Sequence, residues 1–182
     1  MTAPRTWATQ RLDEIVNGQA TVLPPVIQTL RLGGLDEWGV GWIKKRWQPH
    51  PDLLNVDGSL FGGYLAALAD QALAFAAMTV LPGDRVFRTI NLNVTFIRVS
   101  RTHPVEIEAV VVAQTERMLT VRATLKREDG ELIAEASAQQ TLQSSEEIRT
   151  RNAAVAPNNA LEPTACRPRV AASVGVTPKS DW

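Results

Sequence analysis

The segment that most constrains the fold runs from Ser59 to Gly83, where Asp70 is the only charged residue. It is nearly long enough to cross a bilayer, but a carboxylate near its middle would cost roughly 2.5–3.5 kcal/mol on insertion scales. Alanine and leucine, the strongest helix formers, dominate residues 62–81, and Pro82-Gly83 ends the pattern. We therefore expect a helix over residues 62–81 that is apolar nearly all round and buried in a core, with no membrane as a partner.

Shorter patterns flank this segment. Residues 6–17 predict an amphipathic helix, with its apolar side made by Trp7, Leu12, Ile15 and Val16. Alternating apolar residues predict one strand over residues 38–47 and four more over residues 86–98, 105–113, 119–125 and 131–142. Short connections imply that the last four strands are antiparallel neighbours in a meander, and Asp129-Gly130 marks a hairpin turn between two of them.

The order of these elements predicts an α+β fold, in which a curved antiparallel β-sheet wraps around the long central helix. A helix that is apolar on most sides needs such a surface, and small residues would let the sheet approach it closely; these are Ala66, Ala69, Ala72 and Ala76. We expect an N-terminal helix and linker over residues 1–25, one folded domain over residues 26–143, and a C-terminal tail over residues 144–182. The aperiodic stretch 152–182 predicts disorder.

Composition excludes several function classes. The chain has 19 basic and 19 acidic residues, so it lacks the basic field that nucleic-acid binding usually needs. Cys166 is the only cysteine, so no disulfide can form within the chain. The first residues lack the apolar core of a signal peptide, and we expect a cytoplasmic protein.

Asp70 is the first candidate for chemistry. A buried carboxylate is costly unless it is hydrogen-bonded, paired or neutralised, so its place on an apolar helix suggests a catalytic base. The alternative is a surface aspartate on the one wet stripe of the helix, which the adjacent Gln71 would extend.

Gly62 and Gly63 are the second candidate, because the first N–H groups of a helix have no partner within it. Two glycines would let a carbonyl oxygen approach those donors and the positive end of the helix dipole. The alternative is a tight packing turn. Gly62 and Asp70 are eight residues apart, about 12 Å along a helix, which is too far to act on one carbonyl. A dimer with two such helices side by side would bring both groups to the same carbonyl.

Two further polar residues have a functional and an ordinary interpretation. Asn55 could orient water or hold a carbonyl, or simply stabilise a turn. Thr89 could bond Asp70 or water, or be an ordinary polar residue on a strand. His50, His103 and Cys166 show no metal-ligand spacing, so we expect no metal or cofactor.

Three stretches carry a family resemblance: NVDGSLFGGYLAALAD at residues 55–70, TINLNVTFIR at 89–98 and REDGELIA at 127–134. They resemble the PaaI-like hotdog-fold acyl-CoA thioesterases, of the 4-hydroxybenzoyl-CoA thioesterase-type superfamily. That family shows Asn, a Gly three residues on, then His-Gly-Gly, and Leu-Ala-Asp on the helix. The likeness runs from about residue 30 to residue 142.

The resemblance implies a hotdog domain, homodimers that often pair into tetramers, and active sites at the dimer interface. It implies hydrolysis of an acyl-CoA by Asp70 as base or nucleophile, with the Gly62 N–H polarising the carbonyl. Asn55 and Thr89 would position water or substrate, with Asp70 and Asn55 from different subunits. Coenzyme A would be part of the substrate, and no other cofactor is implied. The implied substrate contacts are Phe61, Gly63, Arg98 and Arg101.

Phe61 stands where the family usually has His, and Asn91 where Asp is common. Phe61 therefore favours one alternative from another class, a hotdog module that binds acyl-CoA without cleaving it. A hotdog dehydratase or hydratase would need a catalytic His, and neither His50 nor His103 is well placed. A purely structural dimer would leave Asp70 without a purpose.

Overall fold

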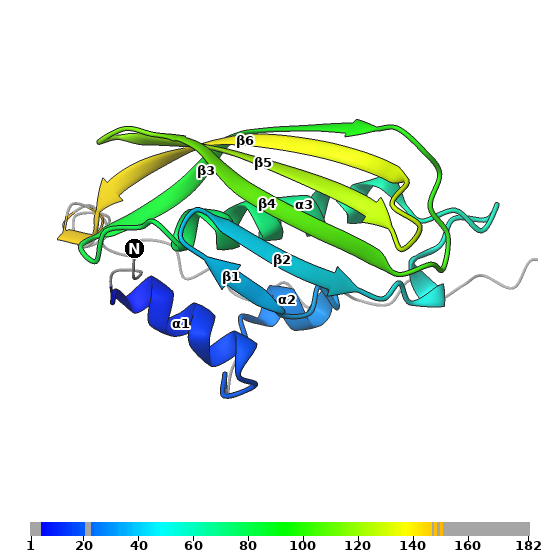
Figure 1. The fold of residues 1–182 in the computed structure, drawn as a ribbon, viewed down its shortest axis with the longest axis horizontal. Helices are drawn as coiled ribbons and strands as arrows, with labels where there is room; N and C mark the ends of the chain where they lie inside the picture. Colours follow the sequence, from blue (N-terminus) through cyan, green and yellow to red (C-terminus); the bar gives the residue numbers. More distant parts are fainter. Residues whose placement is uncertain (1–4, 21–22, 147, 149, 151–182) are drawn as a thin grey trace, which may run out of the picture.

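The structure is a computed structural model that describes residues 5–20, 23–146, 148 and 150. In this part of the chain, the secondary structure consists of helices and one β-sheet (Figure 1). The helices are α1 (Trp7–Val16), α2 (Pro25–Thr29) and α3 (Gly62–Met78), with a 3-10 turn at Pro51–Leu53. The strands are β1 (Glu37–Gly39), β2 (Trp42–Trp47), β3 (Arg85–Phe96), β4 (Val105–Gln114), β5 (Met118–Arg127) and β6 (Leu132–Ser144).

The sheet has six strands in the order β1-β2-β4-β5-β6-β3, and all neighbours are antiparallel. It lies across α3, which contacts every strand from β2 to β6 (Figure 1). The predicted α+β class, with a long helix against an antiparallel sheet, is confirmed. Among the described helices, none combines the length and apolar character needed to span a bilayer.

Helix α3 forms the centre of the core. Leu68, Leu73, Ala69, Ala72 and Ala76 on its sheet side are 0% exposed. Burying each leucine side chain stabilises the fold by about 1.5–3 kcal/mol, and the alanines allow close approach of the strands. The expectation that Ala66 also faces the sheet is wrong, because Ala66 is only half-buried and lies on the other side of the helix.

The helix begins at Gly62, as predicted, but ends at Met78 rather than residue 81. The Thr79 hydroxyl donates to the Ala76 carbonyl at 2.7 Å and accepts from the Gly41 N–H at 2.9 Å. A threonine that bonds the preceding turn competes with continuation of the helix. The same hydroxyl therefore ties the end of α3 to the turn between β1 and β2.

The single strand expected over residues 38–47 is wrong, because this segment is a hairpin. Strands β1 and β2 pair around a two-residue turn at Val40-Gly41, where Gly41 has φ of +83°. A Cβ on Gly39 would lie 2.5 Å from the indole nitrogen of Trp42, so the Trp42 ring crosses a position that only glycine can occupy. Valine before glycine is not a usual hairpin signal, which is why the alternation concealed the turn.

The predicted four-strand meander is correct only for β4, β5 and β6. Strand β3 pairs with β6 rather than with β4, its neighbour in sequence, and so forms an edge of the sheet. The connection over residues 97–104 crosses the end of the sheet to reach β4 (Figure 1). Eight residues are enough for this crossing, so connection length alone did not reveal the strand order.

Helix α1 is present where predicted, but a different side of it is buried. Ala8 and Leu12 are 0% exposed and join the core beside α3, whereas Trp7 and Val16 remain substantially exposed. The Thr6 hydroxyl and Thr9 form a reciprocal capping box at its start. Residues 152–182, for which the sequence predicts disorder, lie outside the described residues, and the proposed domain limits stay predictions.

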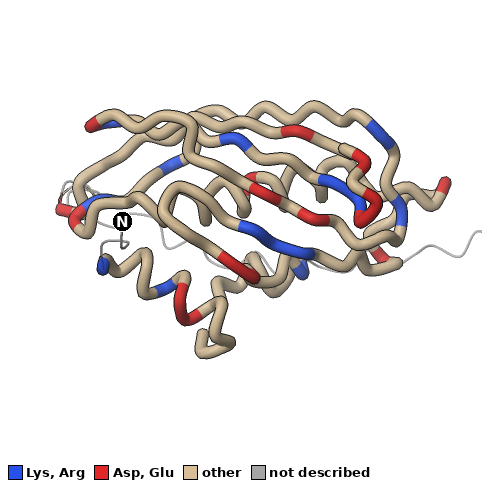
Figure 2. The backbone as a smooth tube through the Cα atoms, in the orientation of Figure 1, with Lys and Arg blue, Asp and Glu red and all other residues tan. Residues whose placement is uncertain are grey.

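The outer face of the sheet carries opposite charges on neighbouring strands. Lys44 and Arg46 on β2 lie opposite Glu108 and Glu106 on β4, and Lys44 is 3.8 Å from Glu108. Blue and red segments accordingly alternate across these strands in Figure 2. Charges on this face compensate one another locally, which distinguishes it from the inner face that packs on α3.

One basic residue of β2 points the other way. Lys45 is 3% exposed, and its ammonium donates to the Leu32 carbonyl and, at 2.5 Å, to the side-chain oxygen of Gln71. Gln71 in turn donates to the Gly33 carbonyl at 2.9 Å. These bonds attach the segment before β1 to α3. Gln71 is therefore a buried structural residue and does not extend a wet stripe beside Asp70.

This buried ammonium predicts a pH dependence of stability. Burial lowers the pKa of Lys45 from 10.5 to about 7, against a smaller opposing effect of Asp36. Between these values the unfolded chain binds more protons than the folded one, so the free energy of unfolding rises with pH. The rise is at most about 1.4 kcal/mol per pH unit for one group.

We expect urea denaturation between pH 7 and pH 9 to show this rise in the wild type and a much flatter profile in Lys45→Met. Parallel profiles for the two proteins would contradict the assignment.

Candidate active site

The side of α3 that faces away from the sheet carries small residues around one carboxylate. This uncovered stripe recurs every three or four residues and consists of Gly63, Ala66, Ala67, Asp70 and Ala74. Gly63 is exposed and the others are half-buried. The stripe is continuous along the helix, so a second surface could approach the backbone of α3 closely.

Asp70 is half-buried on this stripe rather than enclosed in the core. The Thr89 hydroxyl on β3 donates to Asp70 Oδ1 at 3.2 Å. In the described part of the chain, no basic side chain lies within ion-pair distance of Asp70. The carboxylate thus keeps free acceptor positions that open toward the uncovered side of the helix.

Thr89 reaches Asp70 because β3 contains a bulge. Thr89 pairs with Gln140 and Asn91 with Gln139, which leaves Ile90 as an extra residue between them. Strict alternation predicts that Thr89 lies on the face opposite Leu92. The bulge instead places both on the inner face, because their partners on β6 are buried residues of that face.

The start of α3 offers unpaired backbone donors. The Phe61 carbonyl accepts from the N–H groups of Tyr64 and Leu65 at 3.0 and 3.3 Å. The N–H groups of Gly62 and Gly63 have no acceptor among the described residues, and Phe61 supplies no side-chain cap. These two donors sit at the positive end of the helix dipole and can bind a carbonyl oxygen or an anion.

Two aromatic rings flank these donors. A Cβ on Gly63 would lie 2.5 Å from the Phe61 ring, and a Cβ on Gly62 would lie 3.4 Å from the Phe96 ring. A side chain on Gly63 would therefore displace the Phe61 ring, whereas Gly62 has room for a methyl group. Both rings are more than half exposed, so they form apolar walls beside the donors.

An open groove of about 260 Å³ runs from Gly62 along the segment Phe96–Ser100. Leu60 and Leu65 form its floor, and Arg98 lies in its lining. The groove is mostly apolar and has a charged side chain at one position. It fits an extended chain better than a compact polar ligand.

Asn55 organises the loop before α3. Its side-chain amide donates to the Ser59 hydroxyl at 3.0 Å, and its backbone N–H donates to the Ser59 carbonyl at 2.7 Å. Gly58 completes this turn with φ of +75°. Hydrogen bonds from Ser59 lower the pKa of Asp57 below its usual value. The ordinary turn role of Asn55 is therefore present, and its side-chain oxygen has no partner among the described residues.

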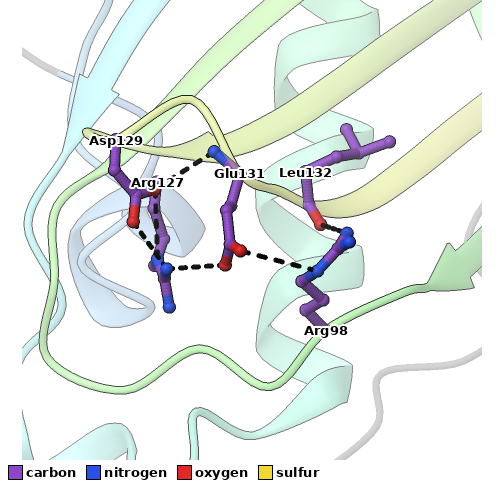
Figure 3. A network of polar contacts seen from close by, with 5 residues as sticks. All are labelled: Arg98, Arg127, Asp129, Glu131 and Leu132. Carbon is purple, nitrogen blue, oxygen red and sulfur yellow. Dashed lines mark hydrogen bonds and ion pairs between the residues drawn. The ribbon is translucent and has the colours of Figure 1, made fainter.

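The two candidate arginines already have partners. Arg101 donates to the Asp57 carbonyl at 2.7 Å, which joins the loop of Asn55 to the segment after β3. Arg98 donates to the Leu132 carbonyl at 3.1 Å, and its Nε lies 3.9 Å from Glu131. Glu131 also binds Arg127, so Arg98 belongs to an exposed network at the β5–β6 turn (Figure 3).

A single chain thus brings together two separate parts of a site. Asp70 and Thr89 meet in the middle of α3, while Gly62, Phe61 and Asn55 lie at its start, about 12 Å away along the helix axis. No group of three His, Cys, Asp or Glu side chains in the described ranges could hold a metal ion.

Sequence reasoning missed Gln140. This residue is 0% exposed on β6, and its amide donates to the Thr89 hydroxyl at 3.4 Å. A signal was available, because Gln140 falls in the apolar alternation of Ala136, Ala138 and Leu142. A polar residue at a core position of a strand requires a partner.

Comparisons with known proteins agree with the observed fold. Residues 57–134 match the family model described as the thioesterase superfamily. Over these residues the chain is similar to the thioesterase superfamily, and its sheet and helix form the predicted hotdog fold. The resemblance to PaaI-like proteins is confirmed at this level. No protein with a curated description matches the chain.

Solved structures share the fold at low identity. A phenylacetic acid degradation-related protein of Ralstonia eutropha JMP134 is 24% identical with a TM-score of 0.64, over 71% of this chain and 98% of that chain. A Haemophilus influenzae thioesterase is 16% identical with a TM-score of 0.66, over 79% of this chain and 96% of that chain. A Streptococcus pneumoniae TIGR4 protein, described as a hypothetical thioesterase and solved with coenzyme A, is 15% identical with a TM-score of 0.57, over 60% and 84%.

Proposed function

We propose that this protein is an acyl-CoA thioesterase that hydrolyses its substrate to a carboxylic acid and free coenzyme A. The observation that carries the proposal is the carboxylate of Asp70, held by the Thr89 hydroxyl on a mostly apolar helix whose first N–H groups have no acceptor among the described residues. The match of residues 57–134 to the thioesterase superfamily supports the reaction class. The single cysteine supports a cytoplasmic location.

The active site is proposed to form between two copies of the chain. Strand β3 is an open edge of the sheet, and Leu92 and Phe96 on its inner face remain exposed beside the uncovered stripe of α3. A second copy that pairs β3 with β3 and α3 with α3 would complete the sheet and cover this apolar surface. Such a dimer would set Asp70 of one subunit opposite Gly62 of the other, and two dimers could then form a tetramer.

In this site the Gly62 N–H polarises the thioester carbonyl and stabilises the oxyanion that forms on it. Asp70 acts as general base or as nucleophile. As a base it takes a proton from water, the hydroxide oxygen bonds to the carbonyl carbon, and the C–S bond breaks. The coenzyme A sulfur leaves with the electron pair and is protonated. As a nucleophile, the Asp70 carboxylate bonds to the carbonyl carbon, the C–S bond breaks, and the coenzyme A sulfur leaves with the electron pair and is protonated. Water then cleaves the acyl-enzyme anhydride and releases the carboxylic acid and Asp70.

Asn55 is proposed to hold the water or the carbonyl through its free side-chain oxygen or its amide. Phe61 and Gly63 would line the acyl side of the site, and the exposed guanidinium groups of Arg98 and Arg101 would contact the coenzyme A phosphates. The solved structure of a hotdog protein with coenzyme A supports this class of ligand.

The second candidate is a module that binds acyl-CoA without cleaving it. The Phe61 ring favours it, because an apolar group packs over Gly63 at the position where the family usually has His. A thiol-release assay over a panel of acyl-CoAs separates the two candidates. Binding that raises the melting temperature without thiol release would favour the module.

We expect Asp70→Asn to lower kcat by roughly 10²–10⁴, because the amide neither accepts a proton nor attacks a carbonyl. Its circular dichroism spectrum and melting temperature should match those of the wild type, since Asp70 is half-buried and the replacement is isosteric. Thiol release at the wild-type rate would remove Asp70 from the mechanism.

The donor role of Gly62 allows a sharper test. Gly62 is the first residue of α3, where proline is favoured, and Phe61 has φ of −61° and ψ of 125°, which suit a following proline. Gly62→Pro therefore removes the N–H and keeps the helix. We expect kcat/KM to fall by roughly 10²–10³.

Gly62→Ala is the matched control, because it keeps the N–H and its methyl group would lie 3.4 Å from the Phe96 ring. Equal activity in the proline and alanine variants would show that this amide is not the oxyanion donor.

A further inference from the structure

Three hydrogen-bonded side chains form a row from the inner face of the sheet to α3. They are Gln140, Thr89 and Asp70. Gln140 on β6 lies between Leu119 on β5 and Thr89 on β3 in the strand register. Its Nε2 donates to Thr89 Oγ1 at 3.4 Å, and that hydroxyl donates to Asp70 Oδ1 at 3.2 Å. The row therefore leads from a fully buried amide to the half-buried carboxylate.

The chemistry of the three groups determines the direction of these bonds. An ionised carboxylate only accepts hydrogen bonds, so the Thr89 hydroxyl must give its proton to Asp70. The hydroxyl oxygen is then available only as an acceptor on its other side. Gln140 can meet this requirement because its NH₂ group donates, and this amide orientation is the one in the structure.

The surroundings of Gln140 argue against a purely structural role. Gln140 is 0% exposed, its neighbour Leu119 is also 0% exposed, and Ala138 is 2% exposed. Its Oε1 has no hydrogen-bond partner among the described residues. An apolar side chain of similar volume would fill the position without an unpaired acceptor. The hydrogen bond to Thr89 is therefore the contact that a glutamine, and not a methionine or leucine, provides here.

We propose that Gln140 is a positioning residue that fixes the Thr89 hydroxyl as a donor to Asp70. The proposal rests on the proposed function of Asp70 and deepens it. Without the amide, the hydroxyl can rotate away from the carboxylate, and Asp70 loses the bond that orients it toward water or the carbonyl carbon.

The kinetic test compares Gln140→Met, Thr89→Val, the double variant and Thr89→Ser. We expect Gln140→Met to lower kcat about tenfold, as for loss of one orienting hydrogen bond, with KM unchanged. The double variant should be no slower than Thr89→Val, because the amide acts only through the hydroxyl. Thr89→Ser keeps the hydroxyl, so its loss of kcat should be smaller than that of Thr89→Val. Multiplicative losses in the double variant, or wild-type kcat in Gln140→Met, would overturn the proposal.

A second test uses nuclear magnetic resonance, and it depends neither on catalysis nor on the folding of a Gln140 variant. The side-chain amide proton signals of Gln140 in the wild type should differ in position from those in Thr89→Val, which removes the acceptor hydroxyl, and from those in Asp70→Asn, which changes the group at the end of the row. Gln140 signals at the same positions in all three proteins would overturn the proposal. Displaced signals in a protein that releases no thiol would instead preserve the positioning role and reject the thioesterase proposal.

Discussion

The structure depends on one helix that must be buried on nearly every side and that carries a single charge. Five strands cover one side of α3, and close packing of its alanines against them gives the core its compactness. The other side remains open, and Asp70 lies in the middle of it. The same constraint that shapes the fold therefore leaves an ionisable group on the face of α3 that the described residues leave uncovered.

The open side of α3 and the open edge of β3 are adjacent, so one partner would cover both. The start of the helix supplies donors and its middle supplies the carboxylate, yet the two lie about 12 Å apart in one chain. In a symmetric dimer, each of the two sites would combine the N–H donors of one subunit with the carboxylate of the other. Stability of the pair and assembly of the active site would then share the same surface.

Much of the fold was predictable from the sequence, because the spacing of apolar residues indicates which side of each helix or strand is buried. The start of α3, the α+β class and the candidate residues Asp70, Gly62 and Thr89 follow from apolar patterns and helix-end chemistry. The hairpin at Gly41 was not predictable, because its turn lies inside an unbroken alternation. The bulge at Ile90 was missed for a related reason, since register depends on the partner strand.

The dependence of register on the partner strand also explains why the contacts of Asp70 were only partly predictable. Which face Thr89 occupies is decided by its pairing with Gln140, a contact between residues 51 positions apart. The place of Gln140 in an apolar alternation signals that it needs a partner, but its bond to Thr89 is recognised only when β6 and β3 are placed side by side. Local patterns therefore identified the candidate reactive groups, and only the tertiary register identified the residues that we propose orient them.

The most direct test of the composite site is a mixing experiment with two inactive variants. Asp70→Asn and Gly62→Pro are unfolded together, refolded as a mixture, and assayed for thiol release. Each mixed dimer would contain one site with both native groups, so random pairing should restore about a quarter of the wild-type activity. Activity that stays at the level of the separate variants, in a mixture shown to contain mixed dimers, would contradict a site shared between subunits.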